Sequence, residues 1–182
     1  MYSNPKLTKT ERLLASFAAS AHAGGGILTV AEIAYFLNEQ KTPALRKFLS
    51  GLVTKGLLRR LVSGVYESSI TPPEPSTAIY KIINKMRASV LNYISLETQL
   101  SHVGEISQVT MGRFTVITKG RSGTFDTPYG VIEFTHTQKS VKKIMPNLYL
   151  DPDIKMFRAT TGQAISDLRM CRRNLHMLDE RS

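Results

Sequence analysis

The stretch from residue 41 to residue 60, KTPALRKFLSGLVTKGLLRR, decides the fold of the first part of the chain. It contains six lysine or arginine residues and no acidic residue. Thr42 is a favourable helix N-cap, Pro43 suits the first helical position, and Gly56 is a favourable stop. Between them, apolar residues recur at helical spacing. One face of the helix is therefore apolar, and the other carries basic and small side chains. The stretch therefore predicts a helix with a cationic outer face, followed by a strand.

Two helices are expected before this one and a hairpin after it. Capping-box spacing at residues 8–11 and 29–32 marks two helix starts. Glycines 24–26 end the first of these helices, because glycine accepts the left-handed conformation of a helix stop. Residues 63–64, Ser-Gly, separate two apolar runs, as in a tight hairpin turn. Three helices and a hairpin in this order predict a winged helix-turn-helix domain over residues 1–70.

Residues 71–75, TPPEP, predict a stiff linker, because three prolines can continue neither a helix nor a central strand. The segment 76–182 is expected to be a second domain, and the whole chain to be α+β. Strands of alternating apolar and polar residues predict an antiparallel sheet there. The expected elements are a helix over 76–87, a helix capped by Ser95 and running to about His102, strand pieces over 113–118, 124–126, 128–130 and 131–136 with a turn at 119–123, and a helix from Thr160 to about Leu178.

The basic helix and the hairpin form the candidate nucleic-acid interface. Cations on such a helix would meet phosphates, while arginine and serine side chains reach base edges in the major groove. A solvated face of an ordinary three-helix bundle is the alternative, and the lack of any acid in the window favours DNA. The residues expected to contact duplex DNA are Thr42, Arg46, Lys47, Ser50 and Lys55, with Arg59 and Arg60 on the wing.

A second basic surface is expected in the second domain. The turn KGRSGT, residues 119–124, either grips an anion or is a plain glycine-rich turn. On the final helix, cations four residues apart share a face. This surface would meet an acidic protein, extend the contact with DNA, or simply be solvated. Its members are Lys119, Arg121, Lys139, Lys142, Lys143, Arg169, Arg172 and Arg173.

Composition narrows the choice of partner. The formal net charge is +10, which points to a polyanion, nucleic acid first and a membrane surface second. The sequence has no transmembrane run and no apolar secretory segment at its N-terminus, and its one cysteine excludes an intrachain disulfide. We therefore expect a cytoplasmic protein without a membrane partner.

The sequence gives little support to catalysis. The four histidines are scattered, and none has metal-ligand spacing. Cys171 and His176 form too small a set for a metal, and Cys171 fits a buried apolar position. Asp126 and Glu133 resemble a nuclease carboxylate pair, but the usual Glu-x-Lys partner is missing. We expect no catalytic residues, no metal and no cofactor, and the chain is not expected to be an enzyme.

Four motifs in order resemble the AbiEi antitoxin family. Residues 93–102, YISLETQLSH, are similar to its "YxSLExALS" helix, and residues 114–130 to its "TxxxxGRSxxFxTPxG" hairpin. Residues 132–136 resemble its "xEFxH" strand, and residues 158–168 the start of its "ATPEKALxDL" helix. The end of the wing, GVY at 64–66, is similar too. The resemblance covers most of the chain, although its last helix has Thr-Gly-Gln at 161–163 where the family shows Pro-Glu-Lys, and Gln99 stands in place of alanine.

The resemblance implies an antitoxin of a type IV toxin–antitoxin system of the phage-defence kind. The winged helix would repress its own operon by binding repeated operator DNA, with a homodimer as one arrangement. The second domain would antagonise a nucleotidyltransferase-type toxin, with or without direct contact. The alternative is a stand-alone winged-helix transcriptional regulator whose second domain senses a ligand or oligomerises.

Overall fold

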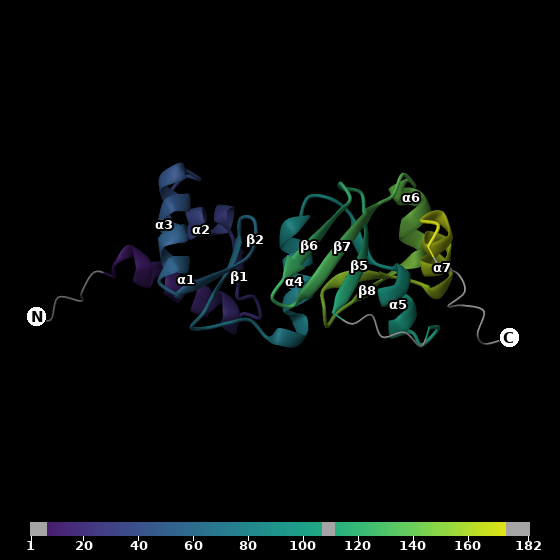
Figure 1. Ribbon diagram of the computed structural model, residues 1–182, viewed down its shortest axis with the longest axis horizontal. Helices are drawn as coiled ribbons and strands as arrows, with labels where there is room; N and C mark the ends of the chain where they lie inside the picture. The colour runs from purple at the N-terminus through teal and green to yellow at the C-terminus, as the bar shows by residue number, and fades with distance from the viewer. Residues whose placement is uncertain (1–6, 107–111, 174–182) are drawn as a thin grey trace, which may run out of the picture. The chain divides into compact units, whose positions relative to one another are not determined.

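The computed structural model describes residues 7–106 and 112–173. It divides into two compact units, Met1–Lys85 and Met86–Ser182. Both contain helices and strands, so the chain is α+β, as expected (Figure 1). Among the helices of the described ranges, none combines the length and the apolar character that a membrane span needs.

The first unit alternates helices with short strands. Its helices begin where the sequence predicts, because Thr8 and Thr29 both form complete capping boxes, and the Thr42 hydroxyl accepts a hydrogen bond from the Leu45 N–H. The order is α1 Lys9–His22, β1 Ile27–Thr29, α2 Val30–Leu37, α3 Pro43–Thr54, β2 Leu58–Val62, β3 Val65–Ser68 and α4 Pro75–Met86.

A three-stranded antiparallel sheet completes this unit, in the order β1-β3-β2. The expected hairpin is β2 and β3, turning at Ser63 and Gly64, where Gly64 has a positive φ of 77°. Strand β1 was not expected. The core beneath joins the inner faces of α1, α2 and α3 to the sheet, and includes Phe17, Ile33 and Leu49, each 0% exposed.

The boundary between the two units lies after Lys85, whereas the sequence placed it at residues 71–75. Helix α4 therefore belongs mostly to the first unit. Lys81 Nζ on α4 donates a hydrogen bond to the Gly25 carbonyl oxygen, and Lys85 forms an ion pair with Glu32. Pro73 packs so closely that a Cβ on Gly26 would lie 3.2 Å from it. The proline-rich stretch thus runs along the first unit before α4 begins.

The second unit is built on one six-stranded sheet in the order β6-β7-β5-β4-β9-β8. The sheet is mixed, which corrects the expected antiparallel one, because β4 pairs with β9 and β5 with β7 in parallel. The elements are β4 Asn92–Ile94, α5 Leu96–His102, β5 Arg113–Thr118, β6 Gly123–Thr127, β7 Gly130–His136, α6 Val141–Ile144, a 3-10 turn Met145–Asn147, β8 Leu148–Asp151, β9 Met156–Ala159 and α7 Thr161–Met170.

Helices α5 and α7 pack together on this sheet around Tyr93, Leu100 and Leu168, each 0% exposed (Figure 1). Helix α7 ends at Met170, not near Leu178, because Arg172 adopts a left-handed conformation with φ 51° that no helix continues through. Leu178 and His176 lie outside the described residues. Arg173 is consequently not on the helix, and the expected pairing of Arg169 with Arg173 on one helical face is wrong.

Candidate nucleic-acid interface

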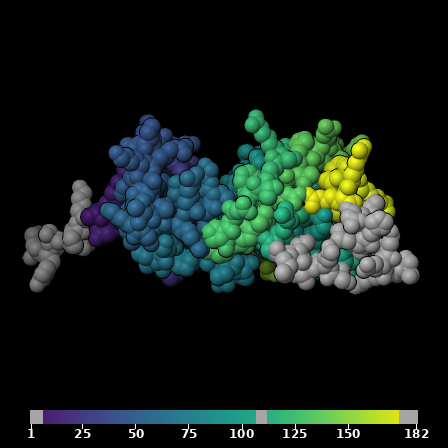
Figure 2. Space-filling view, in the orientation of Figure 1, coloured from purple at the N-terminus to yellow at the C-terminus, as the bar shows by residue number. Residues whose placement is uncertain are grey.

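The outer face of α3 is basic and open to solvent. Arg46, Lys47 and Ser50 are exposed on it, with Thr42 at its N-cap and Lys55 at its C-cap. The opposite face is buried, because Leu45, Leu49 and Leu52 enter the core. In Figure 2 the residues of this helix lie within the blue part of the surface. The fold therefore buries the apolar face of this helix and exposes its basic face, as the sequence predicts.

A cleft of about 260 Å³ lies between α3 and the β2–β3 hairpin. Three expected site residues line it together: Arg46 and Ser50 from α3, and Arg60 from β2. Val53, Gly64 and Tyr66 complete its walls. Two guanidinium groups and a hydroxyl thus converge on one groove, in a form that suits an anionic, hydrogen-bonding ligand such as a nucleic-acid strand.

The two wing arginines have different roles. Neighbouring residues of a strand point to opposite faces, so Arg59 and Arg60 cannot both face the cleft. Arg59 forms an ion pair with Glu67 on β3, whose side chain is only 1% exposed. Arg59 therefore neutralises a buried acid, and Arg60 is the one of the two that lines the cleft.

The glycine-rich turn in the second unit does not present its lysine to an anion. Lys119 Nζ donates hydrogen bonds to the carbonyl oxygens of Thr137, at 2.9 Å, and Lys139, at 3.1 Å. It ties the end of β5 to the segment after β7 and is half-buried. Arg121 is exposed, and its carbonyl oxygen accepts a hydrogen bond from Arg87. Of the two readings of this turn, the structure supports a plain turn at Lys119.

Arg173 also has a structural role. Its guanidinium contacts Glu97 at 3.0 Å and forms a second ion pair with Glu133. Glu133 also pairs with Arg113 at 3.0 Å, so it is no member of a free nuclease pair with Asp126. Arg169, Arg172, Lys142 and Lys143, like Arg121, remain exposed and stay open to a partner.

A buried network around Asp167 was not foreseen in the sequence. This carboxylate is 0% exposed. Its oxygens accept hydrogen bonds from Tyr93 Oη at 2.9 Å, Ser95 Oγ at 2.8 Å and Gln163 Nε2 at 2.7 Å, and Lys139 Nζ lies 3.4 Å away. Ser95 therefore bonds across to α7 and makes no helix-cap hydrogen bond on α5. Burial, and next the Asp167 charge, raise the pKa of Tyr93 above its usual range.

Gln99, where the family pattern has alanine, is also a core residue. It is 0% exposed. Its Oε1 accepts a hydrogen bond from Arg158 Nη1 at 3.3 Å, and its Nε2 donates one to Tyr149 Oη at 3.0 Å. Arg158 in turn donates to Asp151 at 2.6 Å. Gln99 and Arg158 thus hold the edge strand β8 through Tyr149 and Asp151.

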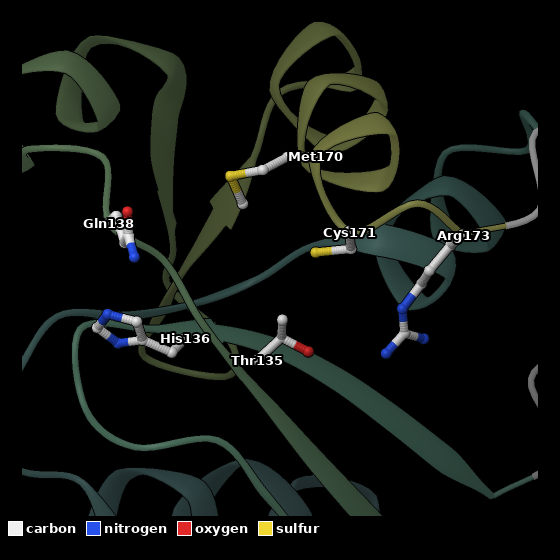
Figure 3. A pocket seen from close by; sticks show the side chains of 6 residues that line it. All are labelled: Thr135, His136, Gln138, Met170, Cys171 and Arg173. Atoms are coloured by element: carbon white, nitrogen blue, oxygen red, sulfur yellow. The ribbon is translucent and has the colours of Figure 1, made fainter.

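A hollow of about 400 Å³ opens beside α7 (Figure 3). Met170 and Cys171 reach toward it from the end of α7, and His136 and Gln138 lie on the other side (Figure 3). One polar group of this hollow already has a hydrogen-bond partner, since His136 Nδ1 is 2.7 Å from the Gly120 carbonyl oxygen. Burial raises the pKa of the Cys171 thiol, which disfavours the reactive thiolate. Within residues 7–106 and 112–173, no three metal-binding side chains gather in one place.

Comparison with known proteins shows the fold alone. No protein-family model and no curated protein matches the sequence. The structure is similar to the crystal structure of the Rv2827c protein from Mycobacterium tuberculosis, with a TM-score of 0.50 and 14% sequence identity. That similarity covers 95% of this chain but 55% of the other protein, so the chain spans about half of its length.

Proposed function

We propose that this chain is the antitoxin of a toxin–antitoxin system, which represses its own operon through the first unit and antagonises a nucleotidyltransferase-type toxin through the second. The observation that carries the DNA-binding part is the cleft in which Arg46, Ser50 and Arg60 converge. The antitoxin part rests on the resemblance of four motifs between residues 93 and 168.

The order of elements supports a winged helix. In such domains the second helix of the helix-turn-helix enters the major groove. In this proposal α3 takes that position, since α2 precedes it across a four-residue connection at 39–42 that follows Asn38, and the β2–β3 hairpin that follows α3 serves as the wing. We infer that Arg46 and Ser50 read base edges, that Lys47 and Lys55 meet phosphates, and that Arg60 approaches the backbone beside the groove.

The DNA-binding role is tested by the salt dependence of binding to a duplex that carries the promoter of the chain's own operon. Each phosphate contact contributes about 0.9 to the slope of log K against log salt. Lys47→Ala should weaken binding to promoter and scrambled duplexes alike and reduce the slope by about one. A slope near zero for the wild-type chain would refute binding to duplex DNA.

The motifs of the resemblance support the second role because they meet in three dimensions. Tyr93 and Ser95 of the first motif and Asp167 of the last share one buried network. This network joins β4 to α7. It therefore fixes the position of α7, whose C-terminal end carries the basic side chains. We infer that a toxin approaches the exposed cations Arg169 and Arg172, with Lys142 and Lys143 on α6.

The proposal requires a nucleotidyltransferase gene beside that of this chain, and co-expression of the two tests this role. The wild-type chain should restore growth, and a chain with Arg169→Glu and Arg172→Glu should not, because an acidic toxin surface would meet like charges. Promoter affinity should fall only by the long-range, screened effect of the lower net charge if these residues serve the toxin alone. Restored growth by the folded double variant would contradict the assignment of this surface.

The runner-up function is a stand-alone regulator whose second unit senses a small molecule. The 400 Å³ hollow beside α7 favours it, because ligand sites are concave and of this size. The two readings differ in one observable result: an antitoxin protects cells from its neighbour's toxicity even with the first unit's DNA contacts removed, whereas a ligand-sensing regulator does not.

A further inference from the structure

Tyr66 is the one buried residue among those that line the cleft between α3 and the hairpin in the described chain. It is only 7% exposed and belongs to the core of the first unit. Strand β3 is the central strand of its sheet, and Tyr66 lies opposite Leu28 on β1 and Arg60 on β2. The core and both neighbouring strands therefore hold this side chain in one position at the cleft.

The hydroxyl of Tyr66 has no hydrogen-bond partner in the part of the chain that the structure describes. Buried tyrosine hydroxyls usually have a partner, because an unmet polar group is costly. Within residues 7–106 and 112–173, the buried side-chain atoms that lack a partner are Thr71 Oγ1 and Arg87 Nε, and Tyr66 Oη is not one of them. Tyr66 Oη therefore reaches the surface, and the surface that this residue lines is the cleft.

The groups around this hydroxyl suit an anion. Arg60 is the direct cross-strand neighbour of Tyr66, so the two side chains lie on one face of the hairpin, with Cβ atoms about 5 Å apart. Arg46 lines the cleft from α3. Among the described residues that line the cleft there are two arginines and no acid. A hydroxyl without a partner thus lies beside a cation, in a place where no carboxylate competes for it.

We propose that Tyr66 is a further DNA-contacting residue, whose hydroxyl donates a hydrogen bond to a backbone phosphate that Arg60 neutralises. The inference rests on the proposed function and adds to it a contact outside the basic window of the sequence. Tyrosine and serine hydroxyls are common partners of phosphate oxygens in complexes with DNA. The acceptor is charged, so this hydrogen bond is stronger than one between neutral groups.

The burial of Tyr66 favours a phosphate over a base edge. Phosphates lie on the outside of a duplex, whereas base edges lie inside its grooves. A phosphate can therefore enter a cleft and reach a recessed hydroxyl, while the exposed Arg46 and Ser50 on α3 can extend into a groove. The ring is already held in place before DNA binds, so the contact costs little conformational entropy.

Replacement of Tyr66 by phenylalanine removes the hydroxyl and keeps the ring. The variant should bind promoter and scrambled duplexes at least about tenfold more weakly. The two losses should be equal, because a phosphate contact carries no sequence information. The slope of log K against log salt should stay the same, since a neutral hydroxyl releases no counterion, in contrast to Lys47→Ala. The unfolding temperature should also stay the same, because the hydroxyl has no partner in the described chain.

Tyr35→Phe is the matched control. Tyr35 is 81% exposed on α2 and does not line the cleft, so this variant should bind like the wild-type chain. Promoter duplexes with a single neutral methylphosphonate, placed at each backbone position in turn, then locate the contact. At one position the difference between the wild-type chain and Tyr66→Phe should shrink from about tenfold to less than about threefold, because the two changes remove the same interaction.

Three results would overturn the inference while leaving the proposed function intact. Equal affinities of Tyr66→Phe and the wild-type chain would show that the hydroxyl meets only water. A loss confined to the promoter duplex would show that it contacts a base. A lower unfolding temperature of Tyr66→Phe would show that it stabilises the protein itself. If the wild-type chain bound neither duplex, the proposed function would fail first, and this inference would fail with it.

Discussion

A chain in which Arg46 and Arg60 are both replaced by alanine will bind promoter DNA about 100-fold more weakly than the wild-type chain. Each arginine that contacts a base or a phosphate in a groove contributes about 1–3 kcal/mol, and 1.4 kcal/mol corresponds to a tenfold change in affinity. Both line the cleft between α3 and the hairpin. Fluorescence anisotropy at fixed salt measures the loss.

Lys142→Ala with Lys143→Ala is the matched control, because it removes the same net charge from exposed positions on α6. This control should lose less than about threefold, the size of a long-range screened effect. Equal losses in the two double variants would mean that net charge, and not the cleft, governs binding. Arg59→Ala is a poor control, because it would leave Glu67 buried without this partner.

Replacement of Asp167 by alanine will destabilise the second unit by about 3–5 kcal/mol, the usual cost of removing one partner from a buried ionic network. Tyr93, Ser95 and Gln163 would keep buried donors without the acceptor they now share. Lys139, whose side chain is 30% exposed, would lose its ion pair as well. Antitoxin activity should fall with the stability of the unit.

Native-state hydrogen exchange measures this change because it reports each unit separately. Amides of β4 and β5 should exchange faster, while those of α3 in the first unit should keep their protection. Asp153→Ala, at an exposed loop position, should leave both unchanged. Protection of β4 unchanged in Asp167→Ala would show that the network does not hold the second unit together.

Local signals predicted the helices well. The capping boxes at Thr8 and Thr29 fixed two helix starts, and both are present. The second sheet was harder, because strands β4, β8 and β9 have three or four residues each and no clear alternation. Parallel pairing of β4 with β9 brings residues 93–94 to residues 157–158. No short-range sequence pattern predicts a pairing between segments so far apart in the chain.

For the candidate site too, local signals predicted well and contacts between distant residues were missed. The acid-free window identified the outer face of α3, because helical periodicity is local. It could not separate Arg59 from Arg60, since the partner of Arg59 lies on the neighbouring strand. Lys119 and Arg173 looked free for the same reason: their partners, Thr137 and Glu97, are distant in sequence or in another motif. Excess positive charge is visible in a sequence, but the acids that neutralise it are placed by the fold.

Binding of duplex DNA in the cleft between α3 and the hairpin is the central claim, and backbone amide chemical shifts test it most directly. The full chain, labelled with ¹⁵N, is titrated with promoter duplex. The largest shifts should fall on α3 and on the hairpin, at Arg46, Ser50, Arg60 and Gly64, with small changes in β8 and β9. Shifts that concentrate in the second unit and spare α3, or an unchanged spectrum at saturating duplex, would contradict the claim.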